Sequence, residues 1–144
     1  LNLRQINKQI FLTRIGLISD THGFLDEAVA EHFKNCDEIW HAGDFGNIDI
    51  ADKLVHSTDK KLRGVYGNID GGDIRTVYPE KLFFTCDQVN VFIQHIGGYP
   101  GRYAPGVKDE IIKNNKKSIE KLSILIRFVI DGKEMKACEV IELD

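Results

Sequence analysis

Three short apolar runs in the first half of the chain each end in a polar loop that contains glycine. They cover residues 14–19, 38–41 and 61–66, and their branched side chains predict buried strands. Between these runs, apolar residues recur at helical spacing, which predicts one helix over about 25–33 and another over about 48–56. The alternation of strand and helix predicts an α/β fold.

Residues 81–115 show a different pattern of apolar and polar positions. Strand patterns at 81–85 and 89–95 flank two polar residues and predict a hairpin. Residues 96–106 hold four glycines and two prolines, so we expect irregular backbone there. A helix is predicted over 107–115, where apolar and charged positions alternate at helical spacing.

The tail of the chain again favours strands. Two strand patterns, at 124–130 and 136–143, flank the Asp-Gly dipeptide at 131–132, which predicts a second hairpin. The length of 144 residues predicts a single domain over 1–144, in which residues 1–13 could form a flexible leader.

Charge, hydropathy and cysteine content exclude several classes of protein. Nineteen basic and 22 acidic residues give a net charge of -3, which offers no footprint for nucleic acid. No apolar stretch approaches the roughly 20 residues of a membrane helix, and the first residues lack a secretory pattern. We therefore expect neither a nucleic-acid nor a membrane partner, while the oligomeric state is left open. The cysteines form no CxxC pair, which predicts a reducing, cytoplasmic location; they are Cys36, Cys86 and Cys138.

Short polar side chains follow the ends of several predicted strands. Asp20 and His22 stand two residues apart after the first strand, and extended backbone would point both to one side. Asp44 follows the second strand, Asn68 follows the third, and His95 ends a later one. Any one of them beside a glycine is more often a turn residue. Because ligands bind at the carboxyl ends of strands in α/β sheets, the five together predict a metal site.

The donor types in this set indicate which metals it would bind. Carboxylate, imidazole and neutral amide suit borderline divalent ions such as Mn, Fe, Co, Ni or Zn better than Ca. Two such ions at a spacing of about 3.5 to 4 Å lower the pKa of a shared water and favour in-line displacement at phosphorus. Asp44 is the natural bridge between them. Two divalent ions carry four positive charges, whereas Asp20, Asp44 and a bridging hydroxide supply three negative ones. The net positive charge of such a site would attract a phosphate group.

Four ordered motifs resemble those of a known family. GLISDTHG at 16–23, HAGD at 41–44, GNID at 67–70 and the strand-ending His95 resemble the calcineurin-like metallophosphoesterases, and within them the small phosphodiesterases of the YfcE type. The resemblance runs from about residue 14 to 106. It implies a β-sandwich of two sheets flanked by helices.

The same resemblance implies the ligand set and the activity. Asp20 and His22 would bind one divalent ion, Asn68 and His95 the other, and Asp44 both. The implied enzyme is a metal-dependent phosphodiesterase in which a metal-activated hydroxide attacks phosphorus directly, with Mn as the expected metal. Its partner would be a small phosphorylated substrate.

The chain departs from the family pattern after His95. The family's later GHxH motif completes both metal shells, but no histidine follows His95, and an NPGS-like stretch is also missing. Two explanations are open. Either the sequence as given lacks a loop near Lys117 that the protein has, which we favour, or the protein itself carries a deletion there and binds metal weakly. The departure keeps open an alternative of another class, a metal-poor protein-binding scaffold similar to the retromer sorting subunit. The retained hard ligands favour the enzyme.

A few further side chains are candidates for a role at the site. Ile69 stands where related phosphatases have a catalytic histidine, so the general acid is unassigned. His41 could orient a ligand or be a rim histidine, and Asp70 could be an acidic partner or a turn residue. Arg102 could bind a phosphate oxygen. Four aromatic residues are expected to pack between the two sheets: Trp40, Phe83, Phe84 and Phe92.

Overall fold

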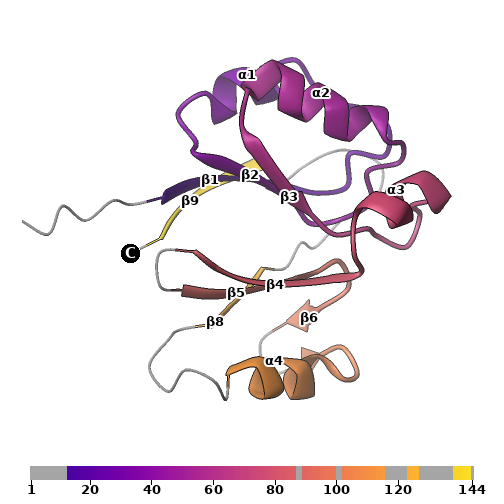
Figure 1. The fold of residues 1–144 in the computed structure, drawn as a ribbon, viewed down its shortest axis with the longest axis vertical. Helices are drawn as coiled ribbons and strands as arrows, with labels where there is room; N and C mark the ends of the chain where they lie inside the picture. Colours follow the sequence, from indigo (N-terminus) through magenta and orange to yellow (C-terminus); the bar gives the residue numbers. More distant parts are fainter. Residues whose placement is uncertain (1–12, 87–88, 100–101, 116–122, 127–137, 144) are drawn as a thin grey trace, which may run out of the picture.

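The computed structural model describes residues 13–86, 89–99, 102–115, 123–126 and 138–143. Strands and helices alternate over the first half, and strands dominate the second (Figure 1). The elements are β1 (Thr13–Ile18), α1 (Ala28–Phe33), β2 (Glu38–His41), α2 (Asp49–Thr58), β3 (Lys61–Gly64), α3 (Gly72–Val77), β4 (Lys81–Cys86), β5 (Val89–Gln94), β6 (Gly98–Tyr99), β7 (Arg102–Tyr103), α4 (Val107–Asn115), β8 (Ser123–Ile126) and β9 (Cys138–Leu143).

The first sheet contains the three strands predicted from the apolar runs. Its order is β3-β2-β1-β9; β1, β2 and β3 are parallel, and β9 is antiparallel to β1. Helices α1 and α2 cover one face of this sheet (Figure 1). Alternation along β1 divides its side chains between two cores, because Ile18 faces the helices while Ile15 and Leu17 face the second sheet.

The second sheet has the order β4-β5-β8, and it packs against the face of the first sheet that the helices leave open (Figure 1). Strands β4 and β5 form the predicted antiparallel hairpin, and β8 runs parallel to β5. Leu17 and Val65 share one core with Val91 and Ile93 of β5. The chain therefore has the α/β fold with two packed sheets and flanking helices that the sequence predicts.

The aromatic residues divide between the two faces of the second sheet. Trp40 is fully buried and meets Phe84 edge to face, with ring centroids 4.9 Å apart, between the sheets. Phe83 and Phe92 instead stack on each other. Phe83 and Phe92 are cross-strand partners, and Phe83 is the neighbour of Phe84 in β4. Because successive side chains of a strand point to opposite faces, Phe83 and Phe92 lie on the outer face of the sheet. The prediction that all four pack between the sheets is wrong for this pair.

The predicted tail hairpin is also wrong. The described part of its first strand, β8, pairs with β5 in the second sheet, whereas β9 pairs with β1 in the first. Both strands take up open sheet edges, which satisfies the backbone groups of β1 and β5 as well as their own. The Asp-Gly dipeptide at 131–132 and the join at 116–121 lie outside the described residues.

Smaller differences concern short elements. Helix α3 was not predicted, and the strands β6 and β7 form a short antiparallel pair inside the segment expected to be irregular. Of the expected leader 1–13, only Thr13 is described, and it begins β1. Cys36 and Cys86 are buried and free, whereas the side chain of Cys138 lies outside the described part. Within that part, no helix is both long and apolar enough to span a bilayer.

Candidate metal centre

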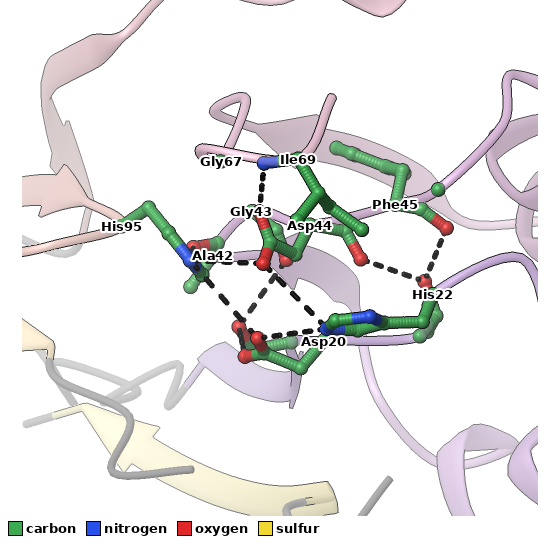
Figure 2. Close-up of polar contacts among 12 residues, drawn as sticks. Asp20, His22, Ala42, Gly43, Asp44, Phe45, Gly67, Ile69 and His95 are labelled. Carbon is green, nitrogen blue, oxygen red and sulfur yellow. Dashed lines mark hydrogen bonds and ion pairs between the residues drawn. The ribbon is translucent and has the colours of Figure 1, made fainter. Parts of the chain in front are cut away.

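The carboxyl ends of β1, β2 and β5 meet at one edge of the two sheets. Asp20 follows β1 by two residues, Asp44 follows β2 by three, and His95 comes directly after β5. Backbone hydrogen bonds hold the first two loops side by side, since Asp20 N donates to Gly43 O at 2.9 Å and His22 N donates to Asp44 O at 3.1 Å. Figure 2 shows the four side chains directed toward a common space.

The backbone of these loops is bent into the left-handed region. Asp20 has φ 58°, His22 has φ 48° and Asp44 has φ 58°. Non-glycine residues adopt this region rarely and at some cost in free energy, and such residues cluster at functional sites. Aspartate and histidine are among the residues that tolerate it best. The bend turns each side chain out of the strand direction and into the shared space.

Two glycines allow the loops to approach. A Cβ at Gly67 would overlap Asp44 Oδ1, and a Cβ at Gly43 would lie 2.7 Å from His95 Nδ1. Gly43 also has φ 107°, which side-chain-bearing residues rarely adopt. Glycine is therefore required next to both ligands.

The four side chains lie within a few ångströms of each other. His22 Nε2 lies 3.5 Å from Asp20 Oδ1 and 3.5 Å from Asp44 Oδ2. His95 Nε2 lies 3.3 Å from Asp44 Oδ2 and 4.0 Å from Asp20 Oδ1. Ligand atoms of Asp20, His22 and Asp44 all fall within 4.8 Å of one another. This spacing is suited to a cation between the atoms.

The hydrogen bonds at the site leave the inward-facing atoms open. Asp20 Oδ2 accepts from Ser19 Oγ, but Asp20 Oδ1 is buried without a hydrogen-bond partner in the described part of the chain. Asp44 Oδ1 accepts from Ile69 N at 3.1 Å, which leaves Oδ2 for the site. His95 Nδ1 donates to Ala42 O at 2.9 Å, so in the neutral ring Nε2 is an unprotonated acceptor facing two carboxylates.

Acceptors that face one another without a donor need a cation or a proton between them. Burial raises the pKa of Asp20, while the hydrogen bond from Ser19 and the charge of His95 lower it; the nearby charge of Asp44 raises it, and the contact with His22 lowers it. A divalent ion would satisfy the unpaired oxygen of Asp20, the bare nitrogen of His95 and the inner oxygen of Asp44 together. The residues present therefore fit a divalent metal.

The comparison with known families agrees with this geometry. A family model described as the calcineurin-like phosphoesterase superfamily domain matches residues 13–120. The chain belongs to this superfamily. No curated protein matches the sequence.

Solved structures with TM-scores above 0.5 show the same fold at low sequence identity. The solution structure of protein TM1076 from Thermotoga maritima has 20% identity and a TM-score of 0.58, covering 91% of this chain and 99% of its own. Vacuolar protein sorting 29 from Cryptosporidium parvum has 17% identity and a TM-score of 0.55, covering 74% of this chain and 61% of its own. The phosphoesterase YfcE from E. coli has 17% identity and a TM-score of 0.49, covering 64% and 63%.

This chain covers less than two thirds of most of these structures. It spans 46% of a predicted phosphoesterase from Streptococcus pneumoniae, to which it is 24% identical with a TM-score of 0.42, and about three fifths of the sorting protein and of YfcE. The superfamily and the fold are thus shown, while activity, substrate and partners are matters for proposal.

The remaining ligand candidate of the superfamily site is Asn68. It is exposed on the loop after β3 and borders a cleft that His95 also lines. Its role as a ligand stays a prediction. Arg102 lies exposed in β7, and phosphate binding by Arg102 also stays a prediction.

His41 is fully buried, so the interpretation as a rim histidine is wrong. Its ring stacks on Phe45 with centroids 3.6 Å apart, and burial together with the charge of His95 lowers its pKa to about 3. Gly43 N donates to His41 Nδ1 at 3.1 Å, and Nε2 lies 3.1 Å from Thr21 Oγ1. These contacts link His41 to both loops of the candidate site, and its role in orienting a ligand stays a prediction.

Asp70 also holds loops together. Its Oδ2 accepts from Gly67 N at 2.7 Å and its Oδ1 accepts from Gly46 N at 2.9 Å. Because both oxygens of this buried carboxylate bind backbone groups, its contacts are those of a turn residue that ties the GNID loop to the loop after β2.

The structure adds a cleft that the sequence did not indicate. It has a volume of about 220 Å³ and lies beside His95; Arg75 and Gln94 contribute to its wall. The sequence does not indicate Arg75, because α3 is short and begins at Gly72, directly after Gly71, so it has no periodic apolar pattern. Gln94 falls within the strand pattern at 89–95, which gives no sign of a cleft.

Proposed function

We propose that this domain is a metal-dependent phosphodiesterase that acts on a small phosphorylated substrate in the cytoplasm, with two divalent ions, preferably Mn. The observation that carries the proposal is the buried Asp20 Oδ1, which has no hydrogen-bond partner among the described residues and lies near the Nε2 atoms of both His22 and His95. Membership of the calcineurin-like phosphoesterase superfamily supports hydrolysis of a phosphate ester.

The proposal assigns each side chain a function. Asp20 and His22 would hold one ion, Asn68 and His95 the other, and Asp44 both. Bound divalent ions supply Lewis acidity, which lowers the pKa of water and polarises the phosphate. The hydrogen bond from His95 Nδ1 to Ala42 O keeps the ring in the orientation and tautomer that present Nε2 to the site.

Within the described residues, neither Ile69 nor Asp70 can protonate the leaving group. Ile69 is exposed on the loop where related phosphatases carry an imidazole, and both oxygens of Asp70 are bound to backbone groups. We therefore propose that the enzyme favours esters with good leaving groups, which need no general acid.

The direct test is hydrolysis of bis(p-nitrophenyl) phosphate by metal-stripped protein. Adding Mn²⁺ should restore activity, and Asp44→Asn should abolish it because one neutral amide cannot bridge two cations as a carboxylate does. Asp109→Asn is the matched control, since Asp109 is exposed on α4. Undiminished activity of Asp44→Asn would refute the bridging role.

A protein-binding scaffold is the second candidate function. The fold similarity to vacuolar protein sorting 29 and the lack of any histidine after His95 favour it. The scaffold predicts that the purified protein neither takes up Mn²⁺ nor hydrolyses any ester. Mn-dependent turnover that is lost in Asp44→Asn would exclude a purely scaffolding role.

A further inference from the structure

The cleft beside His95 offers chemistry that the metal centre does not use. The cleft opens next to His95. Its wall carries the guanidinium of Arg75, the carboxylate of Glu80 and the amide of Gln94. Its volume of about 220 Å³ is smaller than the several hundred Å³ of typical drug-sized sites, so it suits a small group. A phosphate bound at the metal ligands would lie next to this opening, because His95 lines the cleft.

Arg75 is held in position by two anchors. Its Nε donates to Asp70 O at 2.7 Å, and its guanidinium carbon lies 4.5 Å from the centroid of the Tyr66 ring. In the described part of the chain, its two terminal nitrogens make no further hydrogen bond or ion pair. A guanidinium that is stacked and tethered loses little freedom on binding, so these nitrogens form a pre-organised fork for an anion.

Gln94 supplies a second, independent sign of a ligand. Its Nε2 donates to Ile96 O at 3.1 Å, which fixes the amide, while its Oε1 is buried and has no hydrogen-bond partner among the described residues. A buried acceptor without a donor is costly, and such groups in native proteins mark missing ligands or waters. Glu80, which is exposed in the same wall, can accept a hydrogen bond from a hydroxyl group in the cleft.

We infer that the cleft binds one alcohol portion of the phosphodiester, a small hydroxylated group that carries a second anion, either a carboxylate or a phosphate. Arg75 binds that anion and so selects the substrate. The inference rests on the proposed function, because it assumes that the scissile phosphate occupies the metal centre.

The test compares two phosphonates that differ only in the second anion. Propylphosphonate and 3-phosphonopropionate share the same phosphonate head and chain length, and neither can be hydrolysed. Calorimetry with the Mn-loaded protein should give a dissociation constant about tenfold lower for 3-phosphonopropionate, as charge-assisted hydrogen bonds to a guanidinium predict. Arg75→Gln should reduce this preference to below about twofold, and Arg75→Lys should keep part of it.

The control is Lys53→Gln, which removes one exposed positive charge from α2 and should keep the full preference. Affinity for propylphosphonate should be the same in all variants, because that ligand does not reach Arg75. An unchanged preference in Arg75→Gln, or an equal loss of affinity for both phosphonates, would overturn the inference. With Mn²⁺ uptake and hydrolysis of bis(p-nitrophenyl) phosphate intact, the proposed function would still stand. Failure of uptake and hydrolysis in the wild type would overturn both.

Discussion

Single glycines decide how closely the ligand-bearing loops approach one another. The Asp44 carboxylate lies against the backbone of Gly67, and His95 lies against Gly43. A methyl group at either glycine would occupy space that a ligand needs. The glycines of the GNID and HAGD motifs are therefore explained by contact with neighbouring ligands as much as by turn formation.

Gly67→Ala tests this contact. Its Cβ would displace Asp44, so we expect the dissociation constant for Mn²⁺ to rise by about tenfold or more. The matched control is Gly71→Ala, because a Cβ there meets no atom within 4 Å. Titration calorimetry of the two variants checks the prediction, and equal affinities would contradict it.

The buried histidine behind the loops predicts a pH dependence of stability. Because the pKa of His41 is lowered to about 3 in the folded protein and is about 6.5 when unfolded, only the unfolded chain binds this proton between those values. Its contribution to stability is therefore present above about pH 6.5 and is lost as pH falls toward 3. The free energy of unfolding should fall more steeply in the wild type than in His41→Gln, by about 1.4 kcal/mol per pH unit between pH 6 and 4.

Urea unfolding of metal-free protein at several pH values measures both slopes. His56→Gln replaces an exposed histidine of α2 and retains His41, so it should follow the wild type. Parallel slopes for the wild type and His41→Gln would show that the buried ring is not the source of the pH dependence.

Residue type and strand-end position were enough to predict that Asp20, His22, Asp44 and His95 converge. They were not enough to assign His41 and Asp70, because the roles of these residues depend on partners from other loops. His41 contacts Thr21, and Asp70 contacts Gly46, in each case more than 15 positions away along the chain. Such partners become visible only once the loops are placed in space.

At the scale of elements, α1 packs on the first sheet through the ring of Phe33, which lies against Gly16 of β1. Phe33 is fully buried, and a Cβ at Gly16 of β1 would lie 2.7 Å from its ring. The absence of a side chain at Gly16 lets the helix lie close to the strand. This contact helps to hold β1 in place, and Asp20 follows the end of that strand.

Gly16→Ala should destabilise the protein by about 1 to 3 kcal/mol through overpacking. The cost should shrink in a Phe33→Leu background, where the smaller side chain leaves room for the methyl group. Urea unfolding of the two single variants and the double variant measures this coupling. An equal cost in both backgrounds would mean that the two residues do not meet.

Element prediction worked where apolar periodicity was strong and failed where pairing depends on the rest of the fold. The three parallel strands and the β4-β5 hairpin follow from local patterns. The tail strands do not, because β8 and β9 pair with edges in two different sheets, and no local pattern states which edges stay open. Helix α3 is too short to produce a periodic signal.

At the scale of the whole molecule, the candidate metal centre lies where the two sheets meet. Asp20 and Asp44 follow strands of the first sheet, whereas His95 follows β5 of the second. A cation bound by all three would link the sheets, and the unfolded chain would lack this arrangement. Metal binding is therefore expected to stabilise the folded state as a whole.

Adding Mn²⁺ at about 100 times its dissociation constant should raise the free energy of unfolding by about 2.7 kcal/mol, and a chelator should reverse the gain. Urea unfolding with and without the ion measures the change. Stabilisation of the same size in Asp44→Asn would show that the ion binds elsewhere.

The most direct test of the account is calorimetric titration of Mn²⁺ into metal-stripped protein, with Asp44→Asn beside the wild type. We predict saturable binding to the wild type and a dissociation constant at least about tenfold higher for the variant, since it loses a charged donor shared by the site. Binding that does not saturate, or that is the same in both proteins, would contradict the assignment of this strand-end cluster as a metal centre.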